Sequence, residues 1–217
     1  MNGQNGAMQW LQSEALDISV EDGVARITFN RPDKLNAFTA KNYADLRDAI
    51  RLADADPSID VVVLAGKGRA FASGGDLSEL LELSRSGNPL GLDLYIDNTP
   101  MSTIRNAKVV TIAAVDGLCF GGGLVIAALC DFVIASEKAI FSLPEARIGM
   151  AEAISITALF PKLTARDLKA LALTGRRLSA LEAKDIGLVN EVAPNGHLVE
   201  QVNSLISDIR STDRDAR

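Results

Sequence analysis

Two glycine-rich segments are the strongest signs of chemistry in this sequence. One is AFASGGDL at residues 70–77, and the other is DGLCFGGG at residues 116–123. Each follows an apolar, strand-like run and precedes a helix-like run. The first turn of a helix carries unpaired N–H groups and a partial positive charge. Two such turns could aim two N–H donors at one oxygen that becomes negative, which is an oxyanion hole. For either turn alone, tight packing of strand against helix is the alternative interpretation.

Three more segments stand in order with these two. They are NRPDKLNAF from residue 30, FSLPEARIG from residue 141 and LTGRRLSALEAKDIGLVNEV from residue 173. Together the five segments resemble the crotonase family of enoyl-CoA hydratases and isomerases, over about residues 18–192. Each motif alone is weakly specific, but the ordered set is strongly specific. The resemblance implies an α/β protein whose fold is a spiral of repeated ββα units, and the alternation of strands and helices favours the same class.

The resemblance also implies roles for particular residues. The backbone N–H groups of Gly75 and Gly122 would hold the thioester oxygen of an acyl-CoA substrate. Glu145, which follows Pro144 in LPEAR, would transfer the proton. Other residues of the same motifs would border the substrate: Ala72, Ser73, Gly74, Asp76, Leu77, Ser78, Gly121 and Val125.

One position departs from the family's hydratases. They carry a second carboxylate two residues after the last glycine of GGG, where this chain has Val125. Hydration needs groups that activate water and deliver a proton, and valine can do neither. A single carboxylate can move a proton between two carbons of one substrate, which resembles the family's Δ3,Δ2-enoyl-CoA isomerases. The sequence therefore favours isomerisation of an enoyl-CoA double bond, with Glu145 as acid and base.

Several alternatives stay open at this point. Hydration could use Glu145 together with Glu152 or a water network, and Glu152 could equally be an acid at a helix N-terminus. Decarboxylation and thioester hydrolysis would use the same oxyanion hole. A non-catalytic protein of the same fold that binds CoA esters is the alternative from another class.

Composition narrows the functional classes. The net charge of -6 and the pI near 4.9 argue against a nucleic-acid partner. No apolar run reaches the length of a membrane span. One histidine and two cysteines make a metal site or a nucleophilic triad implausible, so we expect no cofactor besides the CoA of the substrate. The two cysteines lie in apolar segments, which fits a reducing compartment and a cytoplasmic location.

The domain organisation follows from the extent of the resemblance. We expect a flexible segment over residues 1–15, a crotonase-like core domain over residues 16–195, and a terminal helix with a polar tail over residues 196–217. Family members usually continue into further C-terminal helices that cover the acyl site and join subunits, so we expect this helical region to be shortened or truncated. The family's trimers or pairs of trimers imply a homotrimer or hexamer.

Patterning predicts the elements that must position these motifs. Strands are predicted at residues 16–20, 24–29, 59–65, 109–115, 131–135 and 188–192, with a tight turn at Asp22-Gly23 between the first two. Helices are predicted at residues 40–53, 76–83, 92–106, 153–160, 165–173, 180–186 and 198–209. Residues 141–149 are predicted to form an irregular loop.

Overall fold

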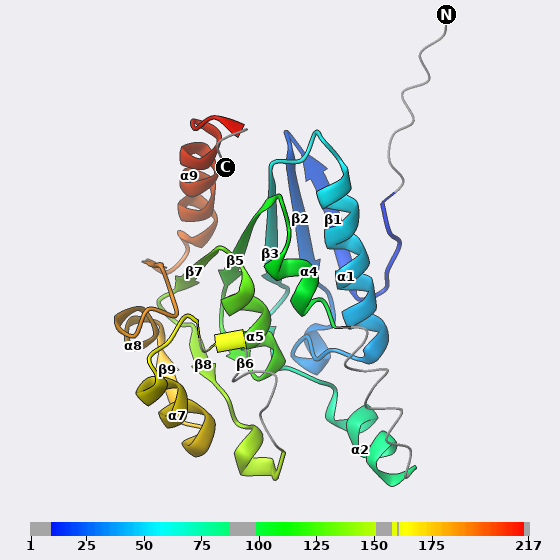
Figure 1. Cartoon of the computed structure of the whole chain (residues 1–217), viewed down its shortest axis with the longest axis vertical. Helices are drawn as coiled ribbons and strands as arrows, with labels where there is room; N and C mark the ends of the chain where they lie inside the picture. The colour runs from blue at the N-terminus through cyan, green and yellow to red at the C-terminus, as the bar shows by residue number, and fades with distance from the viewer. Residues whose placement is uncertain (1–9, 87–98, 151–157, 160, 215–217) are drawn as a thin grey trace, which may run out of the picture.

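The computed structural model describes residues 10–86, 99–150, 158–159 and 161–214, and in this part of the chain the strands form two sheets (Figure 1). The six-stranded sheet has the order β1 (Leu16–Glu21), β2 (Val24–Phe29), β3 (Val61–Gly66), β5 (Val110–Val115), β7 (Phe132–Ser136) and β10 (Glu191–Ala193). Its pairs are parallel except β1 with β2. The four-stranded sheet has the order β4 (Ala70–Ala72), β6 (Leu118–Phe120), β8 (Ile140–Ser142) and β9 (Arg177–Ser179), with only β9 antiparallel.

The described helices are α1 (Ala40–Ala55), α2 (Leu77–Arg85), α4 (Met101–Arg105), α5 (Gly122–Leu129), α7 (Ala165–Thr174), α8 (Ala180–Asp185) and α9 (Leu198–Arg210), with 3-10 turns η1 (Pro32–Lys34) and η2 (Glu145–Ile148). Side-chain caps fix several of their starts. Thr39 and Asn42 form a capping box on α1, and Asp76 caps α2 by accepting the Ser78 N–H. None of these helices combines the length and the apolar character needed to cross a membrane.

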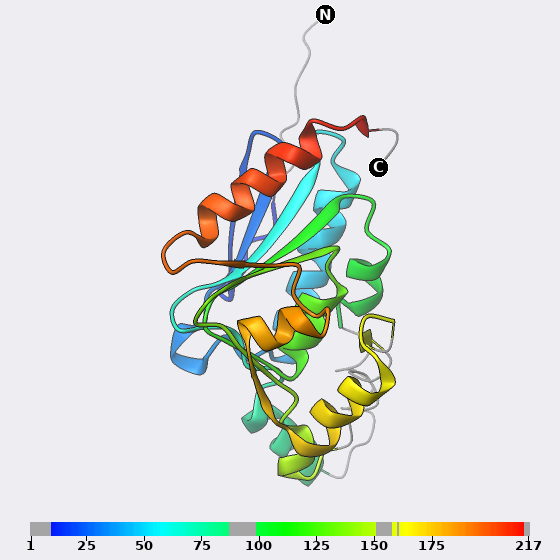
Figure 2. The same ribbon diagram turned by 90° about the vertical axis from the view of Figure 1, so that its left-hand side faces the viewer.

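Helices cover both faces of the six-stranded sheet. Successive side chains of a strand point to opposite faces. In β3, Val62 belongs to the apolar cluster that contains Ile50 of α1, whereas Val63 belongs to the cluster that contains Ile206 of α9. Figure 2 shows α9 crossing one face of the sheet, with α1 and α4 on the other. The near-continuous apolar sequence of β3 is therefore explained by burial on both sides.

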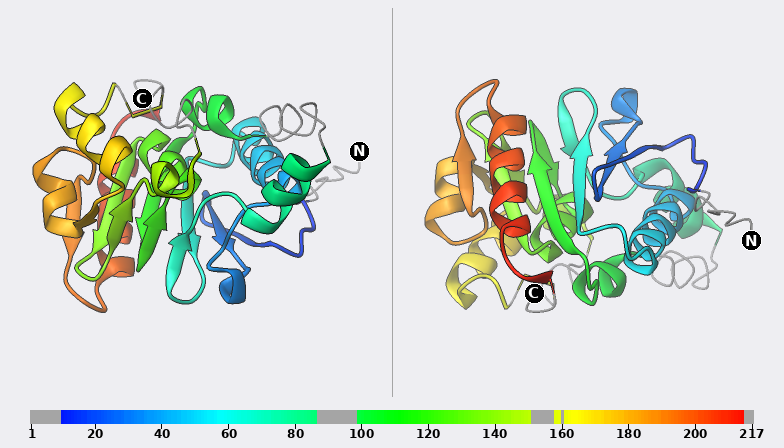
Figure 3. Two further views of the ribbon diagram at one scale, coloured as in Figure 1. Left: turned by 90° about the horizontal axis from the view of Figure 1, so that it is seen from below. Right: turned by 90° about the horizontal axis from the view of Figure 1, so that it is seen from above.

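The spiral predicted from the resemblance is confirmed. The successive pairs β3 and β4, β5 and β6, and β7 and β8 each place one strand in the large sheet and the next in the small one. A helix or 3-10 turn follows each pair. Since β4, β6 and β8 are parallel neighbours, the segments that follow them emerge at one edge of the small sheet. Figure 3, in its view from below, looks onto this end of the molecule, where α2 and η2 lie.

Most predicted elements are confirmed, and the errors concern short strands. The turn between β1 and β2 has positive φ at Asp22 and Gly23. The prediction of an irregular loop at residues 141–149 is wrong at its start, because β8 lies there, and β4, β6 and β9 were not predicted at all. A three-residue strand has too few positions to show a period. The last strand, β10, begins at Glu191 and not at residue 188. The helix predicted at residues 92–106 is described only as α4, and the one predicted at 153–160 lies almost wholly outside the described residues.

We expect the two cysteine thiols to be unreactive in the folded protein. Cys119 of β6 and Cys130, which follows α5, are both fully buried. Burial raises the pKa of the Cys119 thiol well above its usual value, and burial, with the nearby Asp131 charge, raises that of Cys130 to about 12. We expect neither thiol to react with an aromatic disulfide reagent near pH ~8 in the native state, and both to react after unfolding in guanidinium, as read by thiolate absorbance. Rapid labelling of the native protein would contradict this.

Candidate active site

The segment between β4 and α2 carries Gly75, and the backbone of Phe38 fixes its orientation. The Phe38 N–H donates to the Gly74 carbonyl and the Asp76 N–H donates to the Phe38 carbonyl, each at 2.8 Å. This is the bridge of a parallel strand pair, with Phe38 opposite Gly75. Peptide groups of an extended strand alternate in direction, so the Gly75 N–H points away from Phe38. It donates to no other described residue.

The second amide belongs to Gly122, the first residue of α5, where an N–H has no acceptor within the helix. It too donates to no other described residue. Gly74, with φ 96°, packs directly against it: a Cβ on Gly74 would lie 3.0 Å from the Gly122 nitrogen. A side chain at Gly74 would push the two turns apart. The Gly75 and Gly122 amides therefore lie beside each other, and both residues are partly accessible while Gly74 is buried.

The carboxylate of Glu145 reaches the same place from β8. Phe120 of β6 pairs with Ser142 of β8, and the Gly121 N–H donates to the Ser142 carbonyl at 3.0 Å. Glu145 begins η2 three residues later and is 9% exposed. A Cβ on Gly121 would lie 2.4 Å from its Oε1. Gly121 has φ 52°, so both its backbone and this contact require glycine. The ends of three parallel strands thus bring two amides and one carboxylate together.

The other residues predicted for this site lie around these groups. Ala72 is buried at the end of β4, and its carbonyl oxygen would lie 2.5 Å from a Cβ on Gly123. Ser73 is half-buried and its N–H donates to the Leu35 carbonyl at 3.0 Å. Leu77 and Ser78 are exposed on the first turn of α2. Glu152 lies outside the described residues.

Tyr43 is a neighbour of this site that sequence reasoning missed. Its ring stacks on Phe38, with centroids 4.7 Å apart and planes 23° apart. A Cβ on Gly122 would lie 2.3 Å from the Tyr43 hydroxyl oxygen. The helical spacing of Tyr43 predicts burial, and it is 3% exposed. Nothing in the sequence indicates that its hydroxyl reaches the glycine turn.

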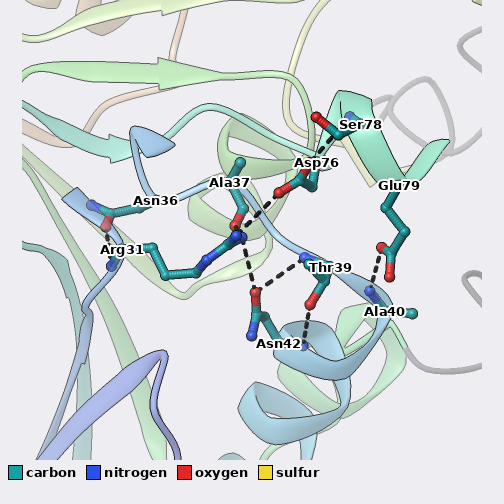
Figure 4. A network of polar contacts seen from close by, with 9 residues as sticks. All are labelled: Arg31, Asn36, Ala37, Thr39, Ala40, Asn42, Asp76, Ser78 and Glu79. Atoms are coloured by element: carbon teal, nitrogen blue, oxygen red, sulfur yellow. Dashed lines mark hydrogen bonds and ion pairs between the residues drawn. The ribbon is translucent and has the colours of Figure 1, made fainter. Parts of the chain in front are cut away.

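Arg31 joins the loop before α1 to the start of α2 (Figure 4). Its Nη2 lies 3.1 Å from Asp76 Oδ2, and its Nη1 donates to the Ala37 carbonyl and to Asn42 Oδ1. Partial burial tends to raise the pKa of Asp76, but the hydrogen bonds from Arg31 and from the backbone of Ser78 outweigh it, and the pKa lies below its usual value. Asp76 is therefore charged near neutral pH. No three His, Cys, Asp or Glu side chains of the described residues cluster as a metal site would require.

Comparisons with known proteins identify the family of this chain. Residues 19–216 match the family described as enoyl-CoA hydratase/isomerase. A Rhizobium meliloti (strain 1021) protein named "Probable enoyl-CoA hydratase" is 36% identical over 204 residues, covering 91% of this chain and 76% of the relative. The peroxisomal Delta(3,5)-Delta(2,4)-dienoyl-CoA isomerase of Arabidopsis thaliana is 30% identical over 190 residues, covering 82% and 68%.

A solved structure gives the same result for the fold. The crystal structure of an enoyl-CoA hydratase/carnithine racemase from Magnetospirillum magneticum has a TM-score of 0.90 to this chain at 28% identity, covering 95% of this chain and 78% of that one. Hydratase names predominate among the sequence relatives. With the family match extending over most of its length, the chain belongs to the enoyl-CoA hydratase/isomerase, or crotonase, family.

Proposed function

We propose that this acyl-CoA-processing protein moves the double bond of a 3-enoyl-CoA thioester to the 2-position. The observation that carries the proposal is the convergence of the Gly75 and Gly122 amides with the Glu145 carboxylate. Two preorganised N–H donors suit an oxygen that becomes negative during the reaction. A carboxylate held beside them suits a proton that leaves and returns on one substrate.

The reaction balances without water or a redox partner. The Glu145 carboxylate takes a proton from C2, and the electron pair of that C–H bond moves into the thioester carbonyl. The resulting oxyanion accepts hydrogen bonds from Gly75 and Gly122. The C3=C4 electron pair then takes the proton from Glu145 at C4, the enolate pair moves to form the C2=C3 bond, and the oxyanion becomes a carbonyl again, with Glu145 left as a carboxylate. Backbone donors that need no reorganisation lower the free energy of the enolate-like state.

The position of Val125 supports isomerisation over hydration. Its N–H donates to the Gly121 carbonyl at 3.1 Å, one helical turn away. Side chains four residues apart share a helix face, and Cβ atoms tilt toward the helix N-terminus. Val125 lies one helical turn after Gly121, the glycine whose Cβ would meet Glu145 Oε1, and it is 1% exposed. An apolar side chain there offers a water molecule no acceptor.

Hydration of 2-enoyl-CoA is the second candidate, favoured by the hydratase names of most relatives. The test offers trans-3-hexenoyl-CoA and trans-2-hexenoyl-CoA separately to the purified protein and follows conjugation by absorbance and added water by mass. We expect the 3-enoyl substrate to convert faster than the 2-enoyl substrate gains water. Efficient hydration with an untouched 3-enoyl substrate would overturn isomerisation in favour of hydration. Turnover of neither, with tight binding of both, would indicate a non-catalytic protein.

A second carboxylate at position 125 should shift the reaction toward hydration. We expect Val125→Glu to raise hydration of 2-enoyl-CoA by about tenfold or more, because a second group could hold and activate the water. Val125→Gln is the control, since it has nearly the same size but no basic carboxylate. Circular dichroism must first show that both variants fold, because a buried charge destabilises the native state. A folded Val125→Glu protein that hydrates no faster than Val125→Gln would contradict the prediction.

A further inference from the structure

We propose that Arg31 is a positioning residue of the oxyanion hole, and that it acts through the backbone of Phe38 on the Gly75 amide. This inference rests on the proposed function, since it concerns the aim of the N–H that would hold the thioester oxygen. The Arg31 side chain bonds to Ala37, Asn42 and Asp76 and to none of the three groups given a part in the reaction, the Gly75 and Gly122 amides and the Glu145 carboxylate.

The guanidinium bridges the two segments that pair at Gly75. Its Nη1 donates to the carbonyl of Ala37, the residue before Phe38. Its Nη2 donates to the carboxylate of Asp76, the residue after Gly75. Figure 4 shows these two contacts of the guanidinium. In the sequence, the bridged residues Phe38 and Gly75 stand next to Ala37 and Asp76. A planar guanidinium holds both acceptors in a fixed geometry, which an ammonium group on a flexible stem cannot reproduce.

The loop that carries Arg31 is itself anchored at its other side. Asn36 is 2% exposed, and its side-chain amide donates to the carbonyls of Lys67 and Ala70 at 3.1 and 2.7 Å. Its side-chain oxygen accepts the Arg31 N–H at 2.9 Å. One end of the loop is thus bound to Lys67 and to Ala70, the first residue of β4, and Arg31 links the loop to the N-terminus of α2. A movement of α2 relative to the loop would turn the Gly75 peptide.

The Arg31–Asp76 ion pair is sheltered enough to matter for positioning. The side chains are 26% and 13% exposed, so solvent and salt screen the pair less than a pair on an open surface. Without Arg31, the Asp76 carboxylate would keep only its contacts to the first turn of α2. The N-terminus of α2 would then hold its place relative to Phe38 through backbone hydrogen bonds and through the Glu79 contact to the Ala40 N–H.

The test uses Arg31→Met, which retains the apolar stem, and Arg31→Lys, which retains the charge without the fork. Arg210→Met is the control for loss of an ion pair outside the candidate site, because Arg210 pairs with the 16% exposed Asp60 just before β3, and Asp60 keeps its second pair with Arg214. The probe is butanoyl-CoA labelled with carbon-13 at the carbonyl, which is saturated and therefore cannot be isomerised or hydrated. Infrared difference spectra of the bound probe report how strongly the two amides polarise the carbonyl.

We expect a lowered carbonyl frequency in the native protein and in Arg210→Met. In Arg31→Met we expect about half of that shift to be lost, because one of the two donors is misdirected. With 3-enoyl-CoA, kcat should fall by about 10- to 100-fold while KM changes by less than about threefold. Arg31→Lys should recover part of both losses.

A folded Arg31→Met protein with the native frequency shift and native kcat would overturn the inference and leave the proposed function standing. If the native protein itself shows no shift with bound probe, the oxyanion hole and the inference fail together. Should Arg31→Met not fold, Asp76→Asn replaces it, since asparagine still caps a helix but lacks the charge that pairs with Arg31. The same partial loss of shift is then expected, and a full native shift would overturn the inference.

Discussion

Replacing Glu145 with glutamine is expected to lower isomerisation by about 10²–10⁴-fold, the range that a positioned general acid and base supplies. Glutamine has almost the same shape, so the packing against Gly121 is retained while the basic oxygen is lost. Binding of saturated acyl-CoA should change little, because the two amides that hold the thioester are backbone groups. Steady-state absorbance with 3-enoyl-CoA measures the first effect, and calorimetric titration with butanoyl-CoA measures the second.

Glu137→Gln serves as the control for the Glu145 variant. Glu137 is exposed and its carboxylate accepts the Asn195 N–H, which a glutamine oxygen can also do. The activity of Glu137→Gln should equal that of the native protein. Full activity in Glu145→Gln would remove this residue from the mechanism and make Glu152 the next residue to replace.

The second large effect is expected from removing the N–H of Gly122. Proline lacks this group and is tolerated at the first position of a helix, so Gly122→Pro should leave α5 in place. Proline, however, has a Cβ, which at position 122 would lie 2.3 Å from the hydroxyl oxygen of Tyr43. The tyrosine ring carbon that carries this oxygen lies farther away, at 3.6 Å. The substitution is therefore made in a Tyr43→Phe background, which removes that oxygen. Activity should fall by about 10²–10³-fold relative to Tyr43→Phe alone.

Comparing the double variant with Tyr43→Phe alone separates the effect of losing the Gly122 N–H from the effect of losing the Tyr43 hydroxyl. Thermal unfolding of both variants shows whether α5 is intact. A double variant that folds and keeps the activity of Tyr43→Phe would exclude Gly122 as a donor to the oxyanion.

The sequence alone predicts the motifs in which glycines or a carboxylate stand at fixed positions next to predicted strands and helices. The GGD and GGG turns and Pro144-Glu145 stood out because glycine and carboxylate have few roles in those settings, and the family match confirms the fold that they indicated. Long strands such as β2 and β3 were predictable because burial imposes a pattern over six residues. The assignment of roles to Gly75, Gly122 and Glu145 stays a prediction.

The rest depended on contacts between distant segments. Arg31 lies in one of the five motif segments, but no local pattern indicates its contact to Asp76. The same holds for the Tyr43 hydroxyl beside Gly122, because both contacts join segments far apart in the sequence. The short strands β4, β6 and β8 form because their neighbours in the sheet accept and donate hydrogen bonds, not because three residues prefer to be extended. That sheet was missed, and with it the physical reason why the segments after its strands meet.

Because the peptide groups around Gly75 alternate in direction, the N–H proposed to bind the anion is a main-chain group, whereas the groups proposed to move protons are side chains. The groups proposed to bind the anion are main-chain N–H groups, and every amino acid except proline carries one. The groups proposed to move protons are side chains, held at Glu145 and at position 125. A single replacement can therefore change the reaction that follows enolate formation without altering the means of stabilising the enolate. On the proposed roles, the scaffold would accept the anion of any thioester that fits, and one or two side chains would set the reaction that follows.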